Sequence, residues 1–298
     1  MLISTDNSVI RAAVGDAESI RLIAEAGFDG IDYSFYGMGP VYDILAKSDG
    51  EREIIAAEIK DCAKRLGIVF PQCHAELKYV YGTIGSDESD PAFLRVVRSM
   101  EYSARIGCPQ IVIHTMKCPL DMPDPDADAI NRDFMRLFLP YAEKYGLYIG
   151  VENLFKHDKP NARFIGRQHT AEWMNRFVDS LGSDLFRVCL DVGHAAVCGS
   201  DPAVFAEGMS PERMTMLHVQ DTDFKGDRHW LPFLGKHDWD AFTSALAKTG
   251  YTGAMNLEVL HFYDRFTPDM WPEALALAAK TARKLADDVE RKKEICRR

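Results

Sequence analysis

Acidic and histidine side chains end four apolar runs of this sequence, and their types suit metal chemistry. The runs end at Glu152, Asp191, His218 and Glu258. Continuous apolar runs of this length are typical of strands that are buried on both faces. If the four strands are parallel neighbours in one closed sheet, their last side chains converge at its carboxyl end, where such sheets place active sites. One imidazole nitrogen with three carboxylates is a ligand set for a hard or borderline divalent cation.

Further histidine and aspartate side chains lie at or just beyond the predicted strand ends. They are His74, His114, His194, Asp227 and His229. A single histidine at a strand end more often makes a structural hydrogen bond than binds a ligand. Several histidines in register with carboxylates instead indicate a functional site. For His74 and His114 the sequence allows two roles, a substrate contact or a structural hydrogen bond. Asp227 and His229 are either a second metal pair or, as we favour, residues that order their loop and contact substrate.

The elements that must position these side chains form eight strand-then-helix units. We expect strands at 2–4, 28–33, 68–74, 110–114, 148–152, 187–194, 214–220 and 253–261. We expect helices at 17–26, 51–66, 91–107, 129–145, 170–180, from about 201, 240–249 and 272–290. The strands are too apolar to have one face in water, and no composition break separates the units. The sequence therefore predicts one (β/α)8 barrel domain over residues 1–298, with a parallel eight-stranded sheet inside a ring of helices.

Two polar segments are expected to be loops over the carboxyl end of the sheet. Residues 118–128 are rich in Pro and Asp, and residues 153–169 contain Asp158 and several basic side chains. Long loops at this face usually bind a ligand. Four basic side chains are candidate phosphate ligands, although most such loop residues are merely solvated: Arg163, Arg167, Arg228 and Lys236.

Composition narrows the class of protein. Lys plus Arg is 35 and Asp plus Glu is 45, a net charge of −10, which disfavours a broad nucleic-acid surface. The seven cysteines are scattered, without a Cys-x-x-Cys pair, and we expect reduced core thiols. The first residues lack a basic, apolar leader, and no run of 18 or so apolar residues occurs. We expect a cytoplasmic protein with no membrane or nucleic-acid partner.

Short motifs around the strand ends carry a resemblance to a known family. They are Ile-Gly-Val-Glu-Asn at 149–153, Leu-Asp-Val-Gly-His at 190–194, His-Val-Gln-Asp at 218–221, Asp-Arg-His-Trp-Leu-Pro-Phe-Leu-Gly at 227–235 and Asn-Leu-Glu at 256–258. In this order the motifs resemble those of the xylose isomerase-like barrel superfamily, and within it the sugar (phosphate) isomerase and epimerase branch. They are specific for the superfamily and not for one substrate.

The resemblance implies one divalent ion, Mn²⁺, Mg²⁺, Co²⁺ or Zn²⁺, held by Glu152, Asp191, His218 and Glu258. It implies that Glu152 and Glu258 are also the acid/base pair that moves a proton through an enediolate of a sugar, sugar phosphate or related keto-polyol. The substrate-binding residues then expected are His74, His114, Asp158, His194, Asp227 and His229. Asp158 is shorter and later than the glutamate that binds sugar in the ketose 3-epimerases, which places a direct 3-epimerase assignment in doubt.

Other functions remain as alternatives on the same residues. Dehydration of a cyclic keto-polyol, of the inosose type, needs the same enediolate. The same nine strand-end positions also resemble those of the barrel-fold abasic-site endonucleases, which hold three zinc ions. A barrel that only binds its ligand is a third alternative. Within the family, loops of a neighbouring subunit often cover the site, so the resemblance leaves open a homo-oligomer.

Overall fold

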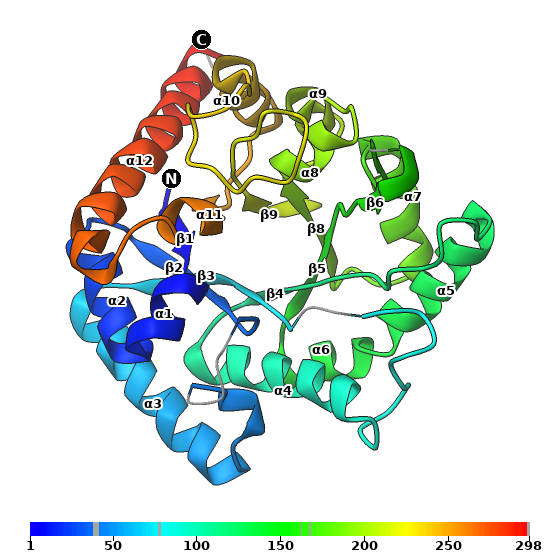
Figure 1. Cartoon of the computed structure of the whole chain (residues 1–298), viewed down its shortest axis with the longest axis horizontal. Helices are drawn as coiled ribbons and strands as arrows, with labels where there is room; N and C mark the ends of the chain where they lie inside the picture. The colour runs from blue at the N-terminus through cyan, green and yellow to red at the C-terminus, as the bar shows by residue number, and fades with distance from the viewer. Residues whose placement is uncertain (38–41, 77–78, 162, 167, 297–298) are drawn as a thin grey trace.

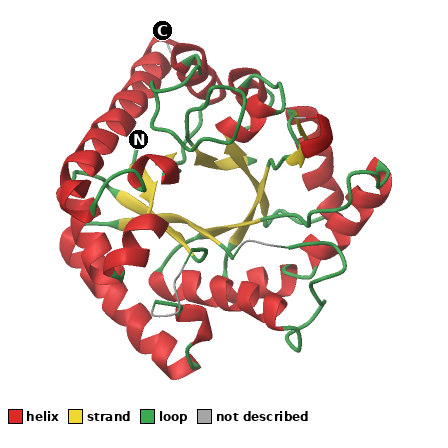
Figure 2. Cartoon of the chain, in the orientation of Figure 1, coloured by secondary structure: helices red, strands yellow, loops and turns green. Residues whose placement is uncertain are grey.

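The computed structural model of the chain describes residues 1–37, 42–76, 79–161, 163–166 and 168–296. Its centre is an eight-stranded parallel sheet that closes on itself, surrounded by helices (Figures 1 and 2). The strands are β1 (Ile3–Asp6), β2 (Gly30–Ser34), β3 (Val69–His74), β4 (Gln110–Ile113), β5 (Tyr148–Glu152), β8 (Phe186–Asp191), β9 (Met214–His218) and β10 (Met255–Leu257).

Neighbouring strands pair in chain order, and the ring closes between its last two members. The hydrogen-bonded order is β10-β1-β2-β3-β4-β5-β8-β9. A parallel bridge from Val219 to Leu257 joins the end of β9 to β10. In this arrangement all carboxyl ends lie at one face of the barrel, and Asp191 is the register partner of His218. The predicted (β/α)8 barrel is confirmed.

Twelve α-helices occur in the described part of the chain, most of them on the outside of the barrel (Figure 1). They are α1 (Ser8–Val14), α2 (Asp16–Glu25), α3 (Asp49–Leu66), α4 (Pro91–Ile106), α5 (Asp124–Arg136), α6 (Leu139–Tyr145), α7 (Ala171–Leu181), α8 (Val192–Val197), α9 (Pro202–Glu207), α10 (Trp239–Thr249), α11 (Leu260–Tyr263) and α12 (Trp271–Cys296). Within the described residues, no helix is both long and apolar enough to cross a membrane.

Local sequence signals set the ends of the outer helices. Ser48 and Glu51 form a capping box at the start of α3, and Gly67 ends that helix in the left-handed conformation. Asp90 accepts hydrogen bonds from the first backbone N–H groups of α4, ahead of Pro91. These features fix where each helix begins and ends, and so where the strand that follows enters the barrel.

The interior of the barrel is filled with side chains. Val112, Cys189 and Met216 form a buried apolar cluster inside the sheet. Gly150 makes room for it, because a Cβ atom at this position would lie 2.5 Å from Cε of Met216. The barrel is therefore a packed core whose chemistry is confined to its carboxyl end.

Several predicted boundaries were wrong, chiefly in the connections. The predicted helix 129–145 is two helices, because Pro140 lacks an N–H group and occupies the first turn of α6. Helix α5 begins at Asp124, inside the predicted loop 118–128. The predicted loop 153–169 contains a two-stranded hairpin, β6 (Lys156–Asp158) and β7 (Arg163–Ile165). The predicted strand 253–261 ends at Leu257, since the chain then turns into α11.

Candidate active site and metal centre

Four strand ends bring three carboxylates and one imidazole together at the carboxyl end of the barrel. One ligand atom from each of Glu152, Asp191, His218 and Glu258 lies within 4.8 Å of the other three. None of these residues is more than 4% exposed. Buried carboxylates this close repel one another unless a positive charge lies among them. We refer to these four residues as the four-ligand cluster.

His218 shows that the cluster fits a cation. Its Nδ1 atom lies 3.2 Å from Oε1 of Glu152 and 3.5 Å from Oε2 of Glu258. Among the described residues, neither ring nitrogen of this fully buried histidine has a hydrogen-bond partner. A buried imidazole without a partner is costly, whereas a nitrogen facing carboxylate oxygens is the ordinary geometry of a metal ligand. Asp32 lies 3.4 Å behind Nε2, where a carboxylate orients a ligating histidine.

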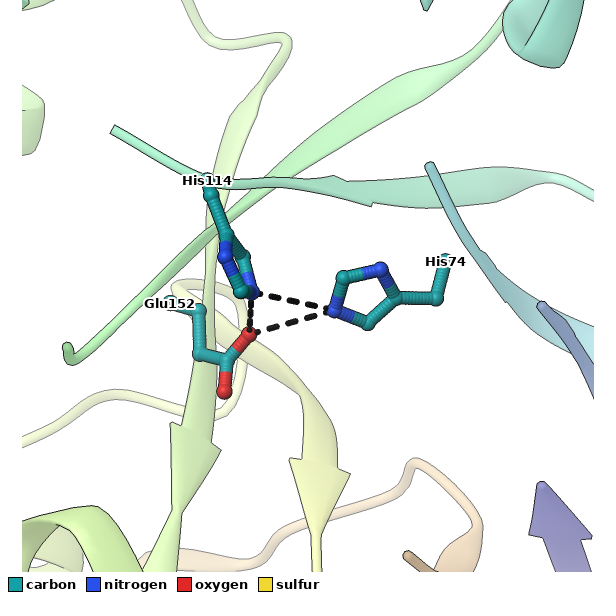
Figure 3. Close-up of side chains that lie close together, drawn as sticks. All are labelled: His74, His114 and Glu152. Carbon is teal, nitrogen blue, oxygen red and sulfur yellow. Dashed lines mark hydrogen bonds and ion pairs between the residues drawn. The ribbon is translucent and has the colours of Figure 1, made fainter. Parts of the chain in front are cut away.

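Glu152 contacts histidines with both of its carboxylate oxygens. On one side, Oε2 lies 2.7 Å from Nε2 of His114 and 3.4 Å from Nε2 of His74 (Figure 3). On the other side, Oε1 lies 3.1 Å from Nδ1 of His194. The structure thus brings His74, His114 and His194 to the cluster, as the sequence predicts, and directs all three at the same carboxylate.

Asp227 lies between two histidines at the other edge of the site. Its Oδ2 atom is 3.1 Å from Nε2 of His229 and 3.6 Å from Nε2 of His194. His229 adopts a positive φ of 45° and its Nδ1 atom lies 2.9 Å from the backbone oxygen of Glu258. Left-handed backbone is unusual for histidine, so the surrounding contacts hold this ring in place at some cost.

The electrostatics of the two glutamates differ. Burial opposes ionisation of Glu152, but the neighbouring imidazoles of His218 and His114 hold its pKa well below the usual range. Burial raises the pKa of Glu258 to about 7, although His218 and His229 act in the opposite direction. Two carboxyl groups whose environments push their pKa values apart are suited to different roles in proton transfer.

Three residues that the sequence did not single out complete the site. Gln220, fully buried, donates from Nε2 to Asp191 and to Asp227 at 2.9 Å, and its Oε1 accepts from the backbone N–H of His229. Asn153 exchanges two hydrogen bonds with the backbone of Asp191. Gln220 follows His218 by two positions, so strand alternation, which puts both side chains on one face, was a signal that could have found it.

Tyr36 is the third missed residue. Its hydroxyl lies 3.1 Å from Oε1 of Glu258 and 3.0 Å from Oδ2 of Asp6. Its ring meets the ring of His74 edge-on. A tyrosine just after a short strand gives no sequence signal of its own, because only the fold brings it to the last strand end.

A cavity of about 460 Å³ opens above the four-ligand cluster. Glu152, Glu258 and every predicted substrate-binding histidine line it, together with Asp227. Asp158 is not among the residues that line the cavity. Its Oδ2 atom accepts from Arg163 at 2.9 Å and from Asn161, within the β6–β7 hairpin. The structure therefore does not bring Asp158 to the site.

Of the four basic side chains considered as phosphate ligands, the three in the described part of the chain do not line the cavity. Arg163 is paired with Asp158, and Arg228 is paired with Asp223 at 3.0 Å. Lys236 is not among the residues that line the cavity. Arg167 lies outside the described residues.

Most of the chain matches one known protein family. Residues 20–284 match the model of the xylose isomerase-like TIM barrel family. The chain belongs to this family. Its barrel, with the chemistry at the carboxyl ends of the strands, agrees with that membership, and the predicted resemblance is confirmed.

One relative of the chain is an epimerase. The chain is 26% identical over 218 residues to 2-epi-5-epi-valiolone 7-phosphate 2-epimerase of Actinoplanes sp., covering 71% of this chain and 70% of that one. The match to an uncharacterised protein of Sinorhizobium fredii, 27% identical over 169 residues, covers 53% of this chain and spans only half the length of that relative.

Solved structures share the whole fold. An L-ribulose 3-epimerase has a TM-score of 0.72 at 17% identity, covering 99% of this chain and 97% of that one. The IOLI protein, solved with a bound zinc atom, has a TM-score of 0.71 at 18% identity, covering 98% and 99%. At these identities the likeness shows the fold, and the chemistry must be argued from the side chains.

Proposed function

We propose that the protein is a divalent-metal-dependent isomerase or epimerase of a small polyhydroxy carbonyl compound. The observation that carries this proposal is the buried four-ligand cluster, in which an imidazole without a hydrogen bond faces two carboxylates beneath a cavity. The epimerases among the relatives support it. We infer a cytoplasmic location from the seven scattered cysteines, which suit a reducing compartment.

The residues present fit one cation, held by Glu152, Asp191, His218 and Glu258. Carboxylate and imidazole ligands select weakly among Mn²⁺, Mg²⁺, Co²⁺ and Zn²⁺. When bound, such an ion draws electron density from a carbonyl and an adjacent hydroxyl and so acidifies the C–H bond between them.

The protein's own side chains then handle the proton. In this proposal one glutamate, Glu152 or Glu258, removes the proton from the acidified carbon and leaves an enediolate. The other glutamate returns a proton to the opposite face, which gives an epimer, or to the neighbouring carbon, which moves the carbonyl. The imidazoles of His114 and His194 and the Asp227–His229 pair lie where they can hydrogen-bond substrate hydroxyls and fix the reacting carbon.

Solvent deuterium uptake tests this function. Metal-loaded protein is incubated with a panel of ketoses and keto-polyols in D₂O, and exchange at the carbon beside the carbonyl is followed by NMR. We expect exchange with at least one compound, and a loss of about 10²–10⁴-fold in Glu152→Gln and in Glu258→Gln. Metal content of both variants is measured in parallel, because each change removes a ligand as well as a base. A metal-loaded protein that exchanges no compound of the panel contradicts the proposal.

A specific observation also supports a second candidate, a zinc-dependent phosphodiesterase acting at abasic sites in DNA. Side chains at the site form four overlapping groups with metal-ligand spacing: His74, His114 and Glu152; His74, His218 and Glu258; His194, Asp227 and His229; Glu152, Asp191, His218 and Glu258. Together they contain all nine strand-end positions. The net charge of −10 disfavours binding to duplex DNA. Three equivalents of zinc and cleavage of an abasic oligonucleotide would favour this candidate over the sugar enzyme.

A further inference from the structure

The cavity is larger than its catalytic floor requires. Its volume of about 460 Å³ lies within the range of about 300–1,000 Å³ that holds drug-sized ligands. The strand-end carboxylates and histidines occupy only one part of the lining. Beyond them the lining is mixed, and its large apolar side chains come mainly from the segments that follow β4 and β5. We call this part the apolar wall, formed by Met116, Leu120, Leu154, Phe155 and Ile165.

The two segments of the apolar wall are tied to each other. Gln168, which is 8% exposed, donates to Oγ1 of Thr115 at 2.7 Å and accepts from the backbone N–H of Leu154 at 3.0 Å. Lys156 donates from Nζ to the backbone oxygen of Pro119. The apolar side chains of both segments therefore line the same cavity.

The apolar wall is also held in shape without a ligand. Asn131, which is 6% exposed, accepts from the backbone N–H of Met116 at 2.7 Å and donates to its carbonyl oxygen at 3.4 Å. The ring of Phe155 meets the ring of His194 edge-on, with centroids 4.9 Å apart. Despite this order, Leu120 remains 48% exposed. A fixed apolar surface that stays open to the cavity favours an apolar ligand group, because ordering the surface costs little when the group binds.

Charges near the apolar wall do not favour an anionic group there. Lys117 and Lys156 line the cavity, but so do Asp124 and Asp128 from helix α5. The positive and negative side chains of these segments balance. An uncharged group gains from the apolar surface, and the equal numbers of positive and negative side chains give an anionic group no advantage.

Building on the proposed function, we propose that the substrate carries an uncharged apolar substituent. Its polyhydroxy carbonyl part lies over the four-ligand cluster, and an aryl or alkyl aglycone lies on the apolar wall. The substrate class is then a glycoside-like keto-sugar, and a free monosaccharide fills only part of the cavity.

Binding of non-reacting probes tests this inference. Isothermal titration compares phenyl β-D-glucopyranoside with methyl β-D-glucopyranoside on the metal-loaded wild-type protein. We expect the phenyl probe to bind at least about tenfold more tightly, which corresponds to about 1.4 kcal/mol. Leu120→Asp, which places a charge on the apolar wall, should reduce this preference to about threefold or less. Leu277→Asp is the matched control, because Leu277 is 52% exposed on the outer helix α12 and should leave the preference unchanged.

Several outcomes overturn the inference. They are equal affinity for both probes, binding of neither probe, and a phenyl preference that Leu120→Asp leaves intact. Binding of these probes requires no turnover. A phenyl preference that depends on Leu120, found without any deuterium exchange, would therefore contradict the proposed reaction and leave the apolar wall standing. Deuterium exchange without a preference for the phenyl probe would support the proposed reaction and contradict the role of the apolar wall.

Discussion

Gln220 illustrates how a residue without reactive chemistry can control the site. Its amide joins Asp191 of the four-ligand cluster to Asp227, and its oxygen holds the backbone of His229. Asp191 and His229 are buried and Asp227 is partly buried, and each would lose a hydrogen bond if the amide were removed. Gln220 is therefore a positioning residue for both edges of the site.

Replacing this amide should weaken metal binding. We predict that Gln220→Leu lowers metal affinity by about 10–100-fold, because a ligand that loses its outer hydrogen bond is no longer oriented. Competition with a fluorescent chelator measures the affinity. Gln110→Leu is the control, since Gln110 makes equivalent bonds to Pro71 and Thr215 at the opposite end of the barrel. Equal affinities for both variants would contradict the role of Gln220.

Metal affinity should also depend on pH through Glu258. Burial raises the pKa of this carboxyl to about 7, and a metal binds its ionised form. In the metal-free protein the ligand is thus increasingly protonated as the pH falls below about 7. We predict that affinity falls as the pH is lowered from about 8 to about 6, and that binding at about pH 6 releases protons. Titration calorimetry in buffers of different ionisation enthalpy measures that release, and a pH-independent affinity would contradict the prediction.

At the residue scale the sequence predicted that the side chains of the four-ligand cluster would converge, because a carboxylate or histidine that ends a buried parallel strand lies at the carboxyl end of the sheet. Their role as metal ligands stays a prediction. Asp158 was selected by its distance in sequence from Glu152. The hairpin that contains it pairs it with Arg163 instead. Tyr36 and Gln220 were missed because their roles arise from neighbours distant in sequence.

At the scale of elements, helix α8 links two parts of the site. It begins directly after Asp191 at the end of β8, and it lies against Gln220, which follows β9. Asp191 caps this helix, accepting from the backbone N–H of His194 at 2.6 Å, so the cap and a proposed metal ligand are the same residue. Gly193 in its first turn lies against Gln220, and a Cβ atom there would come within 2.7 Å of its Oε1 atom. The short helix therefore packs closely against the Gln220 amide, which orients the four-ligand cluster.

A methyl group at position 193 should reproduce the effect of removing the amide. We predict that Gly193→Ala displaces Gln220, lowers metal affinity by about tenfold or more, and costs about 1–3 kcal/mol of stability from overpacking. Gly50→Ala is the control, because a methyl group at this position of helix α3 would meet no atom within 4 Å. Urea unfolding and chelator competition report the two effects, and wild-type affinity in Gly193→Ala would show that the contact is unimportant.

The sequence predicted the long elements better than the short ones. Buried parallel strands and helices such as α3 and α4 have a clear period and capping residues. Helices α1, α8 and α11 span only four to seven residues, too few for a period to appear. The β6–β7 hairpin was missed because its strands have three residues each, too few for an alternating pattern to appear.

At the scale of the whole molecule, the barrel concentrates acidic groups at one end, and a cation should therefore stabilise the fold. We predict that metal present at 100 times its dissociation constant adds about 2.7 kcal/mol to the free energy of unfolding. Thermal unfolding with and without a chelator should show a rise of a few degrees on adding metal. The Asp191→Asn variant should show a much smaller rise, and an equal rise would place the stabilising ion elsewhere.

Metal stoichiometry tests whether the four-ligand cluster binds one divalent ion. Plasma mass spectrometry of the purified protein is compared with the same measurement on Glu152→Gln and Asp191→Asn, and circular dichroism shows that both variants are folded. We predict about one equivalent of Mn, Mg, Co or Zn in the wild type and a large loss in both variants. Three equivalents of zinc would contradict it in favour of the abasic-site phosphodiesterase, and a folded wild-type protein that binds no divalent metal under any loading condition would contradict the proposed chemistry altogether.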